Sequence, residues 1–149
     1  MTLLERIESD LTVALKSGDN FTRDTLRFLK SVIKNAEINS SSELIDEQIV
    51  GLIQKEVKKR LEAETIYNQA NKSELAHNEA KEAHILKQYL PAQLKEEEIK
   101  KIIVAYLSTN PTEIGQLGIA MGKLNVQLKG RADMSLVSKI LRQKISTGS

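Results

Sequence analysis

Basic residues near the C-terminus are the side chains whose types and spacing most directly suggest chemistry. The stretch MGKLNVQLKGRADMSLVSKILRQK, residues 121–144, is rich in Lys and Arg and contains one acid, Asp133. Lys and Arg are the usual side-chain ligands of phosphate groups, and such contacts position a nucleic acid without reading its sequence. We therefore predict a nucleic-acid-binding surface made by Lys123, Lys129, Arg131, Lys139, Arg142 and Lys144.

The glycines of this region do not form a nucleotide-binding loop. A Walker loop needs G-x-x-x-x-G-K-[ST] between a strand and a helix. The segment from Gly118 to Gly122-Lys123 is one residue too short, and Leu124 stands where the hydroxyl should be. Because glycine costs about 1 kcal/mol inside a helix, we interpret Gly115, Gly118 and Gly122 as a place where a neighbouring helix packs close to the backbone. Close approach of an RNA backbone is the alternative.

The turn Gly130-Arg131-Ala132-Asp133 has a structural explanation for two of its residues. Gly130 can adopt the left-handed conformation that ends the preceding helix. Asp133 can cap the next helix by accepting a backbone N–H bond from Ser135 or Leu136. Arg131 has no such structural role, and an arginine beside a helix N-terminus is suited to a phosphate ligand.

A second group of basic residues lies in the N-terminal half. At 100° per residue, four of them share one helix face, and three more cluster on a later segment. Such charges are most often a solvated face, but two basic faces in one bundle can also combine into a surface for an anionic ligand. This secondary basic face comprises Arg23, Arg27, Lys30, Lys34, Lys55, Lys58 and Lys59.

Residues for catalysis or metal binding are scarce. The chain has no Cys, which excludes disulfides, thiolate zinc sites and thiol nucleophiles. His77 and His84 are seven residues apart and do not form a metal-ligand pair; with Glu79 and Glu82 they are expected to be solvated. No G-x-S-x-G nucleophile motif is present. We predict no catalytic residues, no metal and no cofactor.

Composition favours helices with an aliphatic core. Of 149 residues, 40% are hydrophobic and 28% charged, but only 3% are aromatic, and two prolines leave long uninterrupted segments. No apolar run approaches the ~18 residues of a membrane span. The N-terminus MTLLERIESD lacks the apolar segment of a signal peptide. We expect a cytoplasmic protein without membrane contact.

Seven helices are predicted from apolar periodicity and end signals. The first begins with a Thr2/Glu5 capping box, stops at Gly18, and turns Leu4, Ile7, Leu11 and Leu15 or Ala14 inward. Leu61 is expected to face inward on the third helix, and Pro91 to end the fourth. The other six helices are predicted near residues 22–38, 46–70, 73–90, 96–108, 113–128 and 134–145.

The expected architecture is all-α, with a four-helix N-terminal unit and a small three-helix C-terminal domain. We place the domains at residues 1–92 and 93–149. Residues 1–95 hold 14 basic and 15 acidic side chains, whereas residues 96–149 hold 8 and 5. The positive charge is therefore concentrated in the C-terminal domain.

Three segments resemble the YqeY family. They are Lys55-Glu56-Val57-Lys58-Lys59-Arg60, the run from Leu75-Ala76 through Glu79, Glu82 and Ile85-Leu86 to Tyr89-Leu90-Pro91, and Met121-Gly122-Lys123 with Gly130-Arg131-Ala132-Asp133. The family is similar in fold to the C-terminal tail of GatB, a component of the Asp/Glu-tRNA amidotransferase. The resemblance implies two helical domains and a tRNA-holding tail without chemistry of its own, with Lys123, Arg131, Lys139 and Arg142 facing tRNA.

Three functions are consistent with this resemblance. The favoured one is a non-catalytic tRNA-binding accessory protein. The alternative is a protein-interaction module that docks on an amidotransferase or an aminoacyl-tRNA synthetase complex. The second alternative, by family association only, is a carbon–nitrogen ligase with glutamine as amido donor. The sequence does not indicate the oligomeric state.

Overall fold

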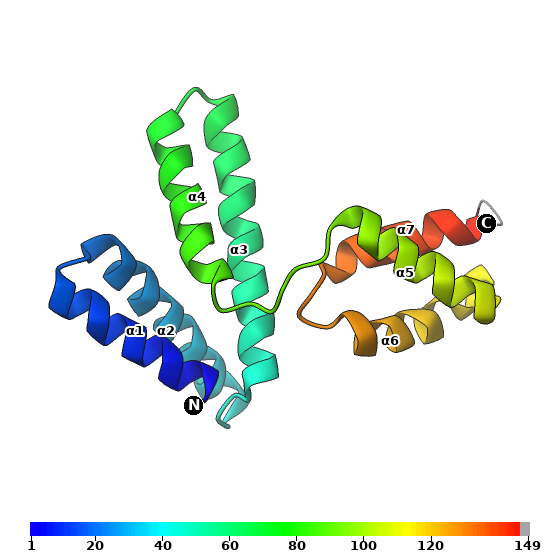
Figure 1. Cartoon of the computed structure of the whole chain (residues 1–149), viewed down its shortest axis with the longest axis horizontal. Helices are drawn as coiled ribbons and strands as arrows, with labels where there is room; N and C mark the ends of the chain where they lie inside the picture. The colour runs from blue at the N-terminus through cyan, green and yellow to red at the C-terminus, as the bar shows by residue number, and fades with distance from the viewer. Residues whose placement is uncertain (147–149) are drawn as a thin grey trace. The chain divides into compact units, whose positions relative to one another are not determined.

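The computed structural model describes residues 1–146, and these residues form helices without any strand (Figure 1). The prediction of an all-helical chain is confirmed. The chain divides into two compact units, Met1–Leu90 and a second that begins at Pro91. The elements are α1 (Leu3–Ser17), α2 (Asn20–Ser40), α3 (Asp46–Gln69), α4 (Ser73–Lys87), α5 (Glu96–Thr109), the 3-10 turn η1 (Ile114–Gln116), α6 (Leu117–Leu128) and α7 (Met134–Ser146).

The ends of α1 are set by local sequence, as predicted. The Thr2 hydroxyl accepts a 3.2 Å bond from the Glu5 N–H, and the Glu5 carboxylate accepts a 2.9 Å bond from the Thr2 N–H. Gly18 ends the helix at φ +75°. This reciprocal bonding satisfies N–H groups that otherwise have no partner at a helix start.

The core of the first unit is aliphatic. The structure decides between Ala14 and Leu15 on α1 and contradicts the prediction for Leu61 on α3. Ala14, not Leu15, is the buried alternative on α1, and Leu15 is 47% exposed. Leu61 is 37% exposed, so the prediction that it faces inward is wrong. Figure 1 shows that α3 and α4 form a hairpin whose far half extends beyond α1 and α2. Apolar periodicity identifies a helix face but does not tell how far the partner helices reach.

The fourth helix ends at Lys87, earlier than the predicted Leu90. Gln88, Tyr89 and Leu90 follow as a tighter turn in which each N–H bonds the carbonyl three residues back. Arg6 Nη2 donates to the Gln88 carbonyl at 2.9 Å, and the Tyr89 hydroxyl donates to Asp10 Oδ2 at 2.6 Å. Burial, together with Asp10, raises the pKa of Tyr89 above its usual range. These contacts fix the end of the first unit immediately before Pro91.

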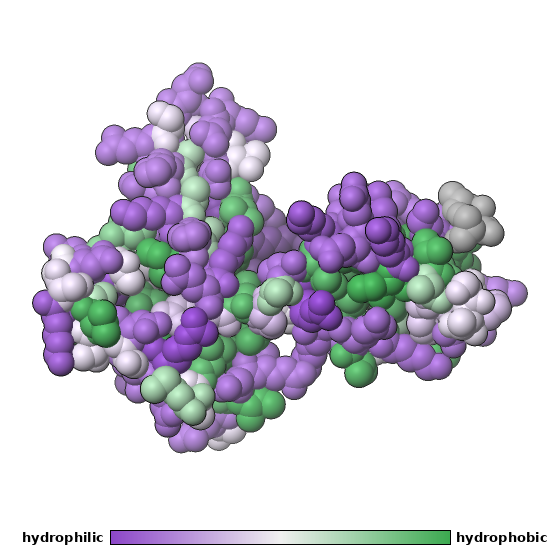
Figure 2. Space-filling model, in the orientation of Figure 1, coloured by the Kyte–Doolittle hydropathy of each residue, from purple (hydrophilic) through white to green (hydrophobic). Residues whose placement is uncertain are grey.

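The second unit packs α5, α6 and α7 around its own aliphatic core. Fully buried Ile103, Leu124, Leu128, Val137 and Leu141 come from all three helices. The helix predicted at 113–128 is divided, since η1 precedes α6. Figure 2 shows hydrophilic side chains over most of the visible face of each unit, interrupted by apolar patches.

Candidate nucleic-acid interface

The turn between α6 and α7 has the backbone geometry predicted for it. Gly130 has φ +77°, a conformation that favours glycine. The Arg131 N–H bonds the Leu128 carbonyl at 2.9 Å. Asp133 Oδ1 accepts a 2.9 Å bond from the Ser135 N–H, which confirms its role as the cap of α7.

The chain entering the second unit holds this turn in place. Gln93 Nε2 donates to the Gly130 carbonyl at 2.7 Å and also to the Pro91 carbonyl at 2.7 Å. The Leu94 N–H donates to the Arg131 carbonyl at 2.8 Å. Because its backbone is held from a separate segment, the exposed Arg131 side chain projects from a fixed position.

Helix α7 presents the most concentrated basic surface of the second unit. Its residues from Met134 to Ser146 include no acid. An open groove along it is lined by Met134, Ser135, Ser138, Lys139, Arg142 and Gln143. Lys139 and Arg142 are exposed, and neither makes an ion pair with the described residues. Their positive charge is therefore available to a ligand.

The remaining predicted residues of the second unit do not share this groove. Lys144 lies two residues, about 200° around the helix, from Arg142 and is half-buried beside the core. Lys123 is exposed on α6, and Lys129 is exposed next to Gly130. The structure thus brings Lys139 and Arg142 together and places the other predicted ligands at separate points.

The prediction of close packing at Gly115 of η1 and at Gly118 and Gly122 of α6 is wrong. A Cβ atom added at Gly115, Gly118 or Gly122 would have no neighbour within 4 Å. Helix α6 packs through its opposite side, where Ala120 and Leu124 are buried. The glycines therefore lie on an open surface, flanked by exposed Ile119 and Val126.

In the first unit, several residues of the secondary basic face have partners within the chain. Arg23 Nε lies 2.9 Å from Asp24 Oδ1, and this hydrogen bond lowers the pKa of Asp24. Lys30 Nζ is 3.7 Å from Glu8 Oε1, and Lys59 Nζ is 3.5 Å from Glu56 Oε1. Arg27, Lys34, Lys55 and Lys58 are exposed.

The two basic groups of the first unit lie away from the buried faces of their helices. At 100° per residue, the basic stripe of α2 is centred about 100° from its buried residues Leu26, Leu29 and Ile33. Lys55, Lys58 and Lys59 lie about 100–160° from Arg60, which shares the face of the buried α3 residues Ile49 and Ile53. Phe28 of α2, whose ring lies 4.9 Å from the Arg60 guanidinium, is itself 44% exposed.

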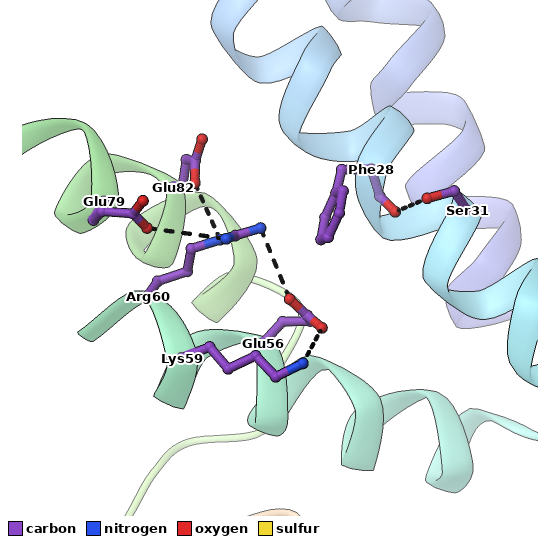
Figure 3. Close-up of polar contacts among 7 residues, drawn as sticks. All are labelled: Phe28, Ser31, Glu56, Lys59, Arg60, Glu79 and Glu82. Carbon is purple, nitrogen blue, oxygen red and sulfur yellow. Dashed lines mark hydrogen bonds and ion pairs between the residues drawn. The ribbon is translucent and has the colours of Figure 1, made fainter. Parts of the chain in front are cut away.

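Arg60 lies at the centre of a charge cluster that sequence reasoning missed (Figure 3). Its Nε is 3.0 Å from Glu82 Oε2, its Nη1 is 4.0 Å from Glu79 Oε2, and its Nη2 is 3.8 Å from Glu56 Oε2. The Nε contact is an ion pair by distance but lacks hydrogen-bond direction. Glu56 is 6% exposed. Glu79 and Glu82 are paired and partly buried, so the expectation that they are solvated is wrong.

The partner of Arg60 was nevertheless encoded in the sequence. In an antiparallel hairpin, residues at equal distances from the turn face each other. Arg60 and Glu82 are each eleven residues from Asn71, which takes the positive φ of 60° in the α3–α4 turn. Burial and the neighbouring Glu79 raise the pKa of Glu82, while Arg60 lowers it. The cluster connects α3 with α4, and Arg60 also contacts Phe28 of α2, which favours a structural role.

Metal ligands do not gather anywhere in the described part of the chain. Within residues 1–146, no group of three or more His, Asp or Glu side chains could hold a metal ion. No helix in that part of the chain is long and apolar enough to cross a membrane. His77 and His84 are exposed, as expected.

The fold and surface described above are those of a small all-helical protein with a basic C-terminal unit. The chain belongs to the YqeY family: the family described as "Yqey-like protein" matches residues 4–145. This match confirms the resemblance read from the three sequence segments.

Two curated relatives carry the same name, "Altered inheritance of mitochondria protein 41, mitochondrial". The protein from Clavispora lusitaniae (strain ATCC 42720) is 30% identical over 108 residues, 71% of this chain and 63% of that protein. The protein from Pyrenophora tritici-repentis (strain Pt-1C-BFP) is 26% identical over 147 residues, 96% of this chain and 81% of that protein. The chain thus spans less than two thirds of the Clavispora relative.

Proposed function

We propose that this protein is a non-catalytic tRNA-binding accessory protein whose C-terminal unit contacts RNA phosphates. The observation that carries the proposal is the groove on α7, where Lys139 and Arg142 lie together on a helix without acids. Arg131, on its fixed turn, and Lys123 add further positive charge to the same unit. Contacts of this kind neutralise phosphates and position RNA rather than read bases.

The proposal includes a division of labour between two domains. In the first unit, Met1–Leu90, several basic side chains are engaged with neighbouring acids. The second unit, which begins at Pro91, contacts RNA and is similar to the GatB tail of the amidotransferase. The family resemblance supports this assignment, and so does the excess of basic over acidic residues in the C-terminal part.

Binding of total tRNA by electrophoretic shift at low and moderate salt tests the proposal. The wild-type chain is compared with Arg131→Ala/Arg142→Ala and with the control Lys100→Ala/Lys101→Ala, which removes the same charge from α5. We expect salt-sensitive binding that the first variant weakens more than the control. Absence of binding at low salt, or binding that does not respond to salt, would contradict the proposal.

A second candidate function rests on the apolar surface of the second unit. Ile119 and Val126, on the open side of α6, are 64% and 84% exposed, and Ile114 in η1 is 62% exposed. Ile119 and Val126 lie about 20° apart around α6, and exposed apolar groups on one face often mark a protein interface. They support docking on an amidotransferase or an aminoacyl-tRNA synthetase. Loss of co-purification with such an enzyme in Ile119→Ser/Val126→Ser, with tRNA binding unchanged, would favour this function.

The cellular location of the protein is part of the same proposal. The predicted location is the cytoplasm. The names of the two relatives make mitochondria the alternative. Fractionation of cells that carry the tagged full-length protein distinguishes the two.

A further inference from the structure

Two serine hydroxyls in the α7 groove have no partner among the described residues. Ser135 and Ser138 line the groove beside Lys139 and Arg142. Helical serines elsewhere in this unit bond their own helix: Ser108 donates to the Ala105 carbonyl at 2.7 Å. The hydroxyls of Ser135 and Ser138 make no such bond to the described chain. They therefore remain available to a ligand in the groove.

These four side chains occupy one face of the helix. At 100° per residue, Ser135, Ser138, Lys139 and Arg142 fall within an arc of about 100°. From Ser135 to Arg142 the helix rises about 10 Å. The face thus offers two hydroxyl donors, an ammonium group and a guanidinium group along a single open groove, with Met134 and Gln143 at its ends.

We infer that this groove is a phosphate-binding subsite in which Lys139 and Arg142 neutralise the charge and the Ser135 and Ser138 hydroxyls donate to phosphate oxygens. A phosphate presents several acceptor oxygens in different directions, which suits four donors at different heights along a helix. Arg, Lys and Ser are all common phosphate contacts in protein–nucleic acid complexes.

The phosphate has two sources, the RNA backbone and free phosphate ion, and the same four donors recognise both. For the RNA backbone, the inference rests on the proposed function. The inference also ranks the basic residues of the second unit. Lys123, on α6, and Lys144, on the core side of α7, lie outside the subsite and contribute only general positive charge.

The test has two arms, both with the full chain. In the first, the isotopically labelled protein is titrated with inorganic phosphate against sodium chloride of equal ionic strength. The chemical shifts of the Ser135 and Ser138 amides and of the Arg142 side chain are followed by NMR. In the second, total tRNA binding is measured for the wild type and for Ser135→Ala/Ser138→Ala. Ser108→Ala and Lys101→Ala, on α5 of the same unit, are the matched controls.

We expect phosphate to shift the groove resonances selectively. We expect the serine variant to weaken phosphate and tRNA binding by at least about tenfold, because hydrogen bonds to a charged phosphate are stronger than neutral ones. Both controls should bind as the wild type does. If the serine variant has the same melting temperature as the wild type, its loss of binding does not come from unfolding.

The outcomes separate the subsite from the proposed function. Selective phosphate shifts without tRNA binding support the subsite, assign its ligand to free phosphate, and contradict the RNA proposal. If phosphate does not shift the groove resonances and the serine variant binds tRNA as tightly as the wild type, the subsite is contradicted. The proposal that the protein binds RNA is unaffected by that result. Equal phosphate shifts at Lys101, Lys123 and the groove also contradict the subsite, because they indicate nonspecific ion association.

Discussion

The Gln93 side-chain amide donates a 2.7 Å hydrogen bond to the backbone carbonyl of Gly130, 37 positions later in the chain. The same nitrogen donates to Pro91, one of the first residues of the second unit. One side chain therefore joins the entry of the unit to the turn that carries Arg131. With the 2.8 Å bond from the Leu94 N–H to the Arg131 carbonyl, this contact supports the turn from outside its own backbone.

Replacing Gln93 by Ala should loosen that turn. Two hydrogen bonds are lost, and Gly130 is buried, so we expect the second unit to lose about 1–2 kcal/mol in free energy of unfolding. The Leu94 amide, which bonds the Arg131 carbonyl, should exchange its hydrogen faster. Gln127→Ala on α6 is the control. Unchanged exchange at Leu94 in Gln93→Ala would show that the backbone alone holds the turn.

Removing Arg60 should destabilise the first unit. Arg60→Met keeps most of the side-chain volume but leaves Glu56, Glu79 and Glu82 without their shared cation. We expect a loss of about 1–3 kcal/mol, because partly buried carboxylates are left without a compensating charge. Urea unfolding followed by circular dichroism measures it. Lys55→Met, an exposed cation on the same helix, should change stability little, and equal losses in both variants would argue against a special role for Arg60.

Glu82 gives the cluster a pH dependence of known sign. Because burial raises its pKa in the folded protein, the fold favours the neutral form. Binding of this proton stabilises the folded protein below the carboxyl pKa of the unfolded chain, about 4.3. This stabilisation is lost as the pH rises through the higher pKa of Glu82 in the folded protein. Glu82→Gln should therefore be at least as stable as the wild type at pH 7, and the difference should vanish near pH 4. A lower melting temperature for Glu82→Gln at pH 7 would mean that attraction to Arg60 outweighs burial.

Glycine substitutions on α6 and in the turn should have opposite effects. Gly122 lies within α6, and an added Cβ meets nothing within 4 Å. Gly122→Ala should raise stability by about 0.5–1 kcal/mol through helix propensity. Gly130→Ala should lower it, since φ is +77° there. Differential scanning calorimetry of both variants measures the signs, and destabilisation by Gly122→Ala would reveal a close neighbour of α6.

Most helices of this chain were predictable because their signals are local. The Thr2/Glu5 capping box and the Gly18 stop depend on residues within a few positions of one another. Asp133 as the cap of α7 is of the same kind. Helix α4 shows the limit, because its end at Lys87 depends on contacts of Gln88 and Tyr89 with α1, far away in sequence.

The sequence was enough to predict which basic residues could form the site. It was not enough to predict which side chains would line one groove. The sequence identifies Lys139 and Arg142 as neighbours three positions apart on one helix, and they do share a groove. Helical periodicity also places Lys144 on the stripe of Val137, Ile140 and Leu141, away from Arg142, and the prediction that it shares the basic surface overlooked this. The sequence offers no reason to single out Ser135 and Ser138, whose availability depends on hydroxyls that make no bond to the helix.

The central claim is that the second unit holds RNA through its phosphates. The most direct measurement is the dissociation constant for tRNA as a function of salt, for the wild type, Arg131→Ala/Arg142→Ala and the control Lys100→Ala/Lys101→Ala. The logarithm of the association constant falls linearly with the logarithm of the salt concentration, and each lost phosphate contact makes this fall shallower by about 0.7–0.9. We predict a fall shallower by about 1.5 in the first variant and nearly unchanged in the control. Identical slopes for all three proteins would contradict the account.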